Sequence, residues 1–297
     1  MHTARGGKFK ITGLDIVLSI ALLAAGLYMV YRIRVGLHYH WNWGAIPQYL
    51  FRYDEARGGF IPNILMQGLF TTIRLSVWGT LLACIIGIVM GLFRTGESIF
   101  RQLVGKTYVE LVRNVPPLVL VFIFYYFIGD QIMTLIGADR FMEGLSDRAQ
   151  AILGFFFGPA AQFSAFLSAL ITIAIFEGAY ITEIVRAGIQ SIPRGQYEAA
   201  YALGLSRMEA MRHVILPQAT KIILPPLAGQ FISTIKDSAI VSVISIQELT
   251  FQGMELMAAT YLTFECWITI TALYLVLTLT LSLGATRLET YIRRNEV

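Results

Sequence analysis

Six long apolar segments recur along the chain, and they limit its fold more than any other feature. A helix of about 20 apolar residues can span a bilayer, because each residue rises about 1.5 Å and the backbone hydrogen bonds stay within the segment. Only 14% of the 297 residues are charged, whereas a soluble domain carries roughly 25%. We therefore predict an all-α integral membrane protein of about six transmembrane helices. The segments are 11–31, 69–93, 115–128, 163–184, 224–246 and 266–288, of which the third is short unless it begins near residue 108.

The first apolar segment follows Arg5, Lys8 and Lys10, as the core of a signal peptide would. Its apolar run is longer than such a core, and no small-x-small cleavage site ends it. We therefore predict a retained helix within residues 1–62, together with an N-terminal tail and an outer loop. Residues 63–297 form the main transmembrane domain, and we expect no separate soluble domain.

Lys and Arg are distributed unevenly over the predicted loops, which indicates the orientation of the chain. Loops rich in these residues stay on the cytoplasmic side. We therefore predict a multi-pass protein of the cytoplasmic (inner) membrane with both termini in the cytoplasm, although the first outer loop is also basic. The inner regions carry Arg5, Lys8, Lys10, Arg94, Arg101, Lys106, Arg186, Arg194, Arg207, Arg212, Lys221, Arg287, Arg293 and Arg294.

The net charge of +4 does not indicate a nucleic-acid partner, because the cations flank apolar segments instead of forming one basic stripe.

The run HYHWNW at 38–43 is typical of an aromatic belt at headgroup depth. A metal site using His38 and His40 would need a further ligand. Cys84 and Cys266 lie inside apolar segments without metal-ligand spacing, so we expect packing residues. We predict no metal and no cofactor.

A polar stretch at about 195–219, between the fourth and fifth spans, predicts two short helices joined by a sharp turn. A helix over 198–203 would end at Gly204, which suits a left-handed cap. A second would begin after Ser206, with Glu209 placed as in a capping box, and Pro217 would limit its length. Ala199 and Ala200 would be exposed for close approach. These features alone leave open whether the stretch is a docking element or an ordinary amphipathic connector.

The same stretch resembles the EAA loop of ABC importer permeases. The resemblance rests on Glu198, Ala199, Ala200, Gly204, Val214, Leu216 and Pro217, with Val214 where Ile is commoner. The flanks EGAYITEIVRAGIQSIPRGQYEAAYALGLS and KDSAIVSVISIQEL resemble the polar amino acid subfamily, the histidine, arginine and glutamine type. The resemblance extends from about residue 67 to the C-terminus. It implies a five-helix type I importer core to which the first helix is an addition. Two departures are KDSAI in place of a KDTSL-like run and a long outer loop at 129–162.

The resemblance implies a permease subunit that moves polar amino acids into the cell. A second permease, identical or different, would complete the path, two cytoplasmic ABC ATPases would supply energy, and an extracytoplasmic solute-binding protein would deliver the substrate. The chain has no GxxxxGK[ST] phosphate loop, so ATP hydrolysis would occur on a separate chain and this chain would not be an enzyme. The expected ATPase-docking residues are Glu198 as polar anchor, Ala199 and Ala200 for close packing, Gly204 at the turn, and Leu216 and Pro217.

Ionisable residues within spans are costly and usually face a bundle interior or a cavity. Glu177 and Tyr180 are three residues apart and share a helix face, where the carboxylate could take a substrate ammonium group. Lys236 and Asp237 are further candidates for the substrate path, or they could serve subunit contacts. Glu183 could simply pair with Arg186. Arg74 lies near the outer end of its span, where snorkelling is cheap.

Two other classes of function compete with this prediction. A secondary transporter or channel would couple ions through the intramembrane charges and often shows inverted repeats; we see none, and the EAA-like loop would have no role. A membrane-embedded enzyme would require HExxH, a Ser with a Lys, or paired aspartates in adjacent spans, and the sequence contains none of these.

Overall fold

The computed structural model describes residues 12–36, 39–56 and 58–294, so Arg5, Lys8, Lys10 and His38 lie outside the described residues. The chain divides into two compact units, Met1–Asn42 and Trp43–Val297. The first unit contains helix α1 (Gly13–Gly36). At its start, Asp15 accepts hydrogen bonds from the Thr12 backbone N–H and hydroxyl at 2.7 and 2.8 Å.

The second unit consists of helices, with one small β-hairpin among the described residues. Its elements are η1 (Trp43–Ala45), α2 (Ile46–Leu50), β1 (Phe51–Asp54), β2 (Gly59–Pro62), α3 (Ile64–Thr95), α4 (Ile99–Asn114), α5 (Pro117–Phe122), η2 (Ile123–Gly129), α6 (Asp130–Ile136), α7 (Ala138–Glu143), α8 (Asp147–Phe157), η3 (Ala160–Gln162), α9 (Phe163–Gln190), α10 (Arg194–Ala202), α11 (Arg207–Ala210), η4 (Met211–Ile215), α12 (Leu216–Asp237), η5 (Ser238–Ile244), α13 (Leu249–Thr260) and α14 (Thr263–Arg294).

Five helical segments among the described residues are long and apolar enough to cross a membrane, which confirms the five predicted core spans. They are Ile64–Thr95, Pro117–Ile136, Ala160–Gln190, Arg207–Ile244 and Thr263–Arg287. The apolar part of α1, Gly13–Met29, is shorter. The third predicted segment is completed downstream, by η2 and α6, and not upstream near residue 108. The chain bends at Pro116 before α5, because proline disfavours helical backbone in the preceding residue.

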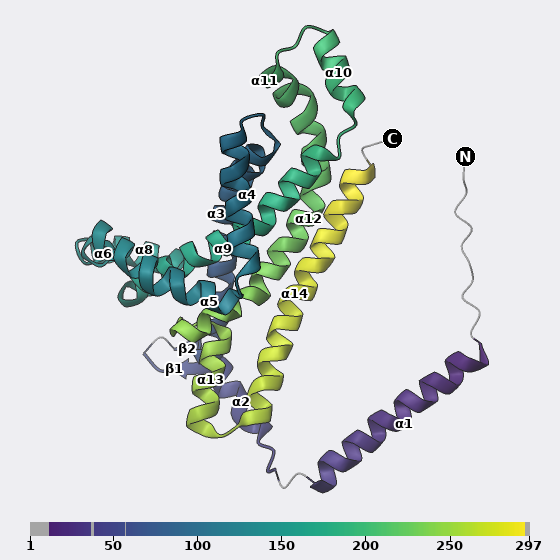
Figure 1. Cartoon of the computed structure of the whole chain (residues 1–297). Helices are drawn as coiled ribbons and strands as arrows, with labels where there is room; N and C mark the ends of the chain where they lie inside the picture. The colour runs from purple at the N-terminus through teal and green to yellow at the C-terminus, as the bar shows by residue number, and fades with distance from the viewer. Residues whose placement is uncertain (1–11, 37–38, 57, 295–297) are drawn as a thin grey trace. The chain divides into compact units, whose positions relative to one another are not determined.

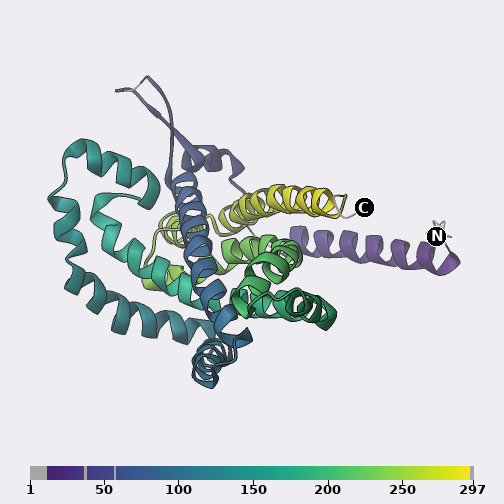
Figure 2. The same cartoon turned by 90° about the horizontal axis from the view of Figure 1, so that it is seen from above.

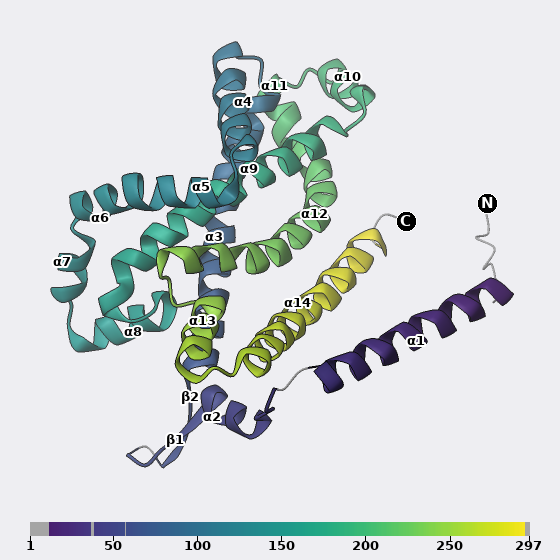
Figure 3. The same ribbon diagram turned by 60° about the horizontal axis from the view of Figure 1, so that its bottom comes forward.

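Within the second unit, α3, α9 and α12 lie side by side and α14 packs along α12 (Figure 1). The pair α10 and α11 lies with α4 at one end, whereas α2, the β1–β2 hairpin and α13 lie at the opposite end. Helices α5 to α8 form an arm that curves back to α9 (Figures 2 and 3). The two regions expected in the cytoplasm, around α4 and around α10, therefore share one end of the unit.

A stripe of small residues lets α3 and α9 pack at close range. Gly79, Ala83, Gly87 and Gly91 recur every four residues on α3, and all four are buried. Small residues at this spacing let two helix backbones approach each other within a membrane. A Cβ on Gly87 would lie 2.4 Å from Ile181 Cγ2 and 3.1 Å from the Ile181 backbone carbon. The close α3–α9 contact therefore requires glycine or another small residue at these positions of α3.

Candidate functional site

The turn between α10 and α11 has the geometry that its sequence predicts. Gly204 is left-handed at φ +79°, its N–H bonds the Tyr201 carbonyl at 2.9 Å, and the Leu205 N–H bonds the Ala200 carbonyl at 3.2 Å. This pair of bonds is the Schellman motif that closes a helix C-terminus. A side chain at position 204 would strain the turn, since the conformation favours glycine.

The second helix begins at Ser206 with the predicted capping box. The Ser206 N–H donates to Glu209 Oε2 at 2.8 Å, and the Glu209 N–H donates to the Ser206 hydroxyl at 3.4 Å. The expectation that Pro217 limits this helix is wrong. The helix passes through a π turn, η4, and continues as α12 with Pro217 in its first turn. A π turn changes the hydrogen-bond spacing just before the proline, which lacks an N–H of its own.

The end of this helix pair exposes a mixed apolar and acidic surface. Glu198 and Ala199 are exposed, and Glu198 makes no hydrogen bond or ion pair with the described residues. Leu203 is 81% exposed and Met208 76% exposed. Ala200 is only 2% exposed, so the expectation that both alanines are exposed is wrong for it. Successive residues project about 100° apart around a helix, and the further turn from Ala199 to Ala200 brings Ala200 onto the buried face of α10.

The helix pair is anchored to α9 and α12 by a common core. Ile189 and Ile192 pack with Ile215 and Ala219, and Tyr197 lies against this cluster. Gln218 Nε2 donates to the Val214 carbonyl at 2.8 Å and to Gln196 Oε1 at 3.2 Å. Leu216 is part of this packing, and Pro217 is exposed beside it. Displacement of α10 therefore acts directly on two spans.

Two ion-pair groups connect α3, and the turn that follows it, to the same region. Glu183 forms ion pairs with Arg94 of α3 and with Arg186, whose Nε and Nη2 donate to Glu183 Oε2 at 2.9 and 2.7 Å. The predicted Glu183–Arg186 pair is thus present and has a further partner. Arg207 pairs with Glu97. Between these groups lies a polar cavity of about 370 Å³, bounded by α3, α9 and α10.

A second polar cluster lies in the middle of the spans and joins α9 to α12. Glu177 is fully buried, and Gln230 Nε2 donates to its Oε2 at 2.6 Å. Its other oxygen, Oε1, accepts no hydrogen bond from the described residues. Thr234 and Asp237 follow Gln230 at intervals of four and three residues, on the same side of α12, and the Glu177 and Asp237 carboxyl groups interact electrostatically.

Tyr180 and Lys236 have different surroundings from Glu177. The Tyr180 ring lies 5.3 Å from the Phe176 ring and 5.2 Å from the Arg113 guanidinium, measured between ring centroids and to the guanidinium carbon. Tyr180 therefore faces α4, while Glu177 faces α12. Lys236 is exposed. The structure thus brings Glu177 and Asp237 together and leaves Tyr180 and Lys236 outside that cluster.

Sequence reasoning missed Glu248, a fully buried carboxylate that accepts four hydrogen bonds. It caps α13 by accepting the Thr250 and Phe251 N–H groups at 2.9 and 2.8 Å, and it also accepts the Tyr274 and Thr72 hydroxyls at 2.9 and 3.3 Å. Burial raises its pKa, and these hydrogen bonds oppose the rise. The available signal was an acidic residue directly before the run LTFQGMEL, because a negative charge is stabilising at a helix N-terminus.

Comparison with known proteins gives one consistent family. Residues 83–294 match the model of the binding-protein-dependent transport system inner membrane component family. The matched range begins within α3 and extends through the helix pair to the end of α14.

Individual relatives agree with this match. The probable glutamine ABC transporter permease protein GlnM of Bacillus subtilis strain 168 is 33% identical over 76% of this chain and 92% of its own length. The glutamate/aspartate import permease protein GltJ of Escherichia coli strain K12 is 33% identical over 85% of this chain and 95% of its own length. A crystal structure of an amino acid ABC transporter with histidines superposes with a TM-score of 0.61 at 33% identity, covering 77% of this chain and 94% of that one.

Proposed function

Because this chain belongs to the family of binding-protein-dependent transport system inner membrane components, we propose that it is the membrane-spanning permease subunit of an ABC importer for polar amino acids. Relatives of about one-third identity are permeases for glutamine and for glutamate and aspartate. The five apolar spans agree with this function. The family assignment argues against the secondary-transporter and channel alternative.

The observation that carries the proposal is the surface formed by α10 and α11. Its tip exposes Glu198, Ala199 and Leu203, and its base shares a core with α9 and α12. We infer that a cytoplasmic ABC ATPase holds this tip in a cleft, so that closure of the ATPase pair displaces both spans as rigid bodies. The ATP would bind and be hydrolysed on that partner. If α10 docks in the cytoplasm, α4 and the C-terminal end of α14 would lie on that side too, and we propose the same side for the N-terminus because of its Lys and Arg residues.

The polar cluster around Glu177 is our candidate for the substrate path. An amino acid carries an ammonium group, and Glu177 Oε1 is a buried acceptor without a donor among the described residues. Asp237 lies beside it and is exposed in the single subunit, where a second permease would enclose a shared path. Lys236 would contact that second subunit or the substrate carboxylate, and Tyr180 would support the cluster indirectly through α9. A solute-binding protein would deliver the amino acid at the opposite end.

Co-purification tests the docking proposal. The chain is co-expressed with its candidate ATPase, and the wild type is compared with Glu198→Arg and Gly204→Val. The first reverses the exposed charge, and the second strains the turn at φ +79°. Both are expected to weaken the complex. Glu143→Arg, on the α7 helix of the lateral arm, is the matched control and should leave it intact. Stable complexes with both test variants would contradict the docking role.

Uptake into vesicles tests the substrate path separately. With ATPase and binding protein supplied, Glu177→Ala is expected to abolish amino acid uptake while the complex still assembles. Normal uptake by this variant would remove Glu177 from the path without affecting the docking proposal.

A further inference from the structure

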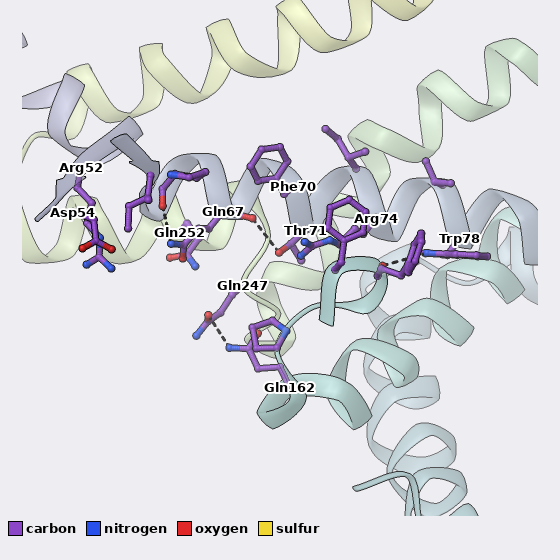
Figure 4. A pocket seen from close by; sticks show the side chains of 17 residues that line it. Arg52, Asp54, Gln67, Phe70, Thr71, Arg74, Trp78, Gln162, Gln247 and Gln252 are labelled. Carbon is purple, nitrogen blue, oxygen red and sulfur yellow. Dashed lines mark hydrogen bonds between the residues drawn. The ribbon is translucent and has the colours of Figure 1, made fainter. Parts of the chain in front are cut away.

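A cavity of about 850 Å³ lies at the end of α3 remote from α10, between α3, the β1–β2 hairpin and the segment that joins α8 to α9. One side of it is apolar, formed by Phe70, Val77, Trp78, Phe155 and Phe156. The other side carries glutamines, of which Gln162 donates to Gln247 at 2.8 Å (Figure 4). The Gln67 amide donates to the Pro62 carbonyl at 3.0 Å. The proposed function uses none of these residues.

Arg74 is the charged residue that α3 contributes to this cavity. It is half-buried and makes no hydrogen bond or ion pair with the described residues. Arg52 and Asp54 also line the cavity, on the hairpin, so the three charged residues leave a net positive charge. An unpaired guanidinium within a span is costly, and an anion at this position would relieve that cost.

The guanidinium of Arg74 can reach the level of the lipid headgroups. With 32 residues, α3 is about 48 Å long and exceeds a hydrocarbon core of about 30 Å by about 9 Å at each end. Arg74 follows the first residue of α3 by ten positions, or about 15 Å, which leaves its Cα about 6 Å inside the hydrocarbon. A side chain of this length can reach the interface from there.

An apolar stripe continues from the cavity along the same face of α3. Phe70, Val77, Leu81, Ile85 and Ile88 follow one another at helical spacing, and Leu81 and Ile85 are 52% and 60% exposed. The stripe lies opposite the buried glycines that pack against α9. A ligand with both an anionic head and a long apolar tail would use the cavity and the stripe together.

We propose that this cavity binds an anionic phospholipid of the leaflet remote from α10, with the headgroup oxyanion on Arg74 and an acyl chain along the Phe70–Val77–Leu81 stripe. A free amino acid also carries an oxyanion that could bind Arg74, but it has no long apolar chain to cover the stripe on α3. One basic residue near an anionic headgroup contributes about 1 kcal/mol, which corresponds to about fivefold enrichment over a zwitterionic lipid.

Quenching of Trp78 by brominated lipids tests the site directly, because this indole lines the cavity. The full chain, with Trp41, Trp43 and Trp267 changed to Phe, is placed in nanodiscs of phosphatidylcholine doped with brominated phosphatidylglycerol or brominated phosphatidylcholine. We expect about fivefold preferential quenching by phosphatidylglycerol. Arg74→Gln should lose the preference, Arg74→Lys should keep it, and Arg101→Gln, at the other end of the spans, should not alter it.

The outcomes separate the possible occupants. Equal quenching by both lipids, or a preference that survives Arg74→Gln, would overturn the proposal. Absence of quenching by either lipid would mean that protein covers the stripe and would also overturn it. Displacement of the brominated lipid by millimolar free glutamine or inorganic phosphate would assign the site to a soluble oxyanion instead. Transport activity does not enter these measurements, so their failure leaves the proposed function unaffected.

Discussion

Replacement of Glu248 by alanine should destabilise the outer end of the transmembrane core more than any neighbouring surface change. The carboxylate accepts four hydrogen bonds, from two backbone N–H groups of α13 and from the hydroxyls of Thr72 and Tyr274. In Glu248→Ala the two N–H groups lose their acceptor. The Tyr274 hydroxyl keeps Thr250 Oγ1 at 3.1 Å, and Thr72 Oγ1 keeps the Leu249 N–H at 3.1 Å.

The magnitude follows from these losses. Loss of an N-cap costs about 0.5 to 2 kcal/mol, and each buried donor left unsatisfied costs about 1 to 3 kcal/mol. Removal of a fully buried carboxylate also relieves its desolvation, which offsets part of the loss. We therefore expect the free energy of unfolding to fall by about 2 to 4 kcal/mol. Glu248→Gln retains one oxygen to cap α13, so we expect it to lower the free energy of unfolding by about 1 kcal/mol.

The assay is thermal or denaturant-induced unfolding of the purified chain in detergent, followed by helical circular dichroism. Glu255→Ala is the matched control, because Glu255 is an exposed acidic residue of the same helix. Equal stability of Glu248→Ala and Glu255→Ala would refute the reasoning, since it would mean that water or neighbouring groups replace the carboxylate at no cost.

Three further predictions concern the protonation of Glu248, the α3–α9 contact and the exposed tip of the α10–α11 pair. Because burial raises the pKa of Glu248, the folded state binds a proton at this carboxyl more tightly than the unfolded state does. The stability of the wild type relative to Glu248→Gln should therefore fall as pH rises above the usual glutamate value of 4.5; parallel unfolding temperatures across that range would contradict this. Gly87→Leu should prevent α3 and α9 from packing, because even a Cβ would lie 2.4 Å from Ile181, and gel filtration should show aggregation. Leu203→Asp should reduce ATPase co-purification by about tenfold. The Leu203 side chain is 81% exposed in the single subunit, and loss of its apolar contact with the ATPase would cost about 1.5 kcal/mol of binding free energy. Unchanged co-purification would exclude Leu203 from the interface.

Local sequence rules predicted the parts of this protein whose geometry depends on neighbouring residues. The length of the apolar runs predicted the five core spans, and Gly204 and Ser206 predicted both caps of the helix pair, because turn and cap conformations are decided within a few residues. The same rules failed at Pro217, where packing against α9 favours a continuous helix with a π turn. They also missed the β1–β2 hairpin and the π-helical stretch η2, which joins α5 to α6 without a break.

The partners of buried polar side chains depend on contacts between residues that are distant in sequence. The spacing of residues along the chain could not predict these contacts. Glu177 and Tyr180 share a helix face in the sequence pattern, but α12 lies against one and α4 against the other. Glu248 lies 176 positions from Thr72, so its connections could not be read from spacing. The candidate docking site was therefore more predictable than the candidate substrate path.

The close packing of α3 on α9 also has a genetic consequence. Every missense change in a glycine codon adds at least a Cβ, and at Gly87 and Gly91 that atom would lie within 2.6 Å of a side chain of α9. At Gly154 and Gly284 no atom lies within 4 Å of such a Cβ. Random mutagenesis followed by selection for transport should therefore recover substitutions at codons 154 and 284 and almost none at codons 87 and 91.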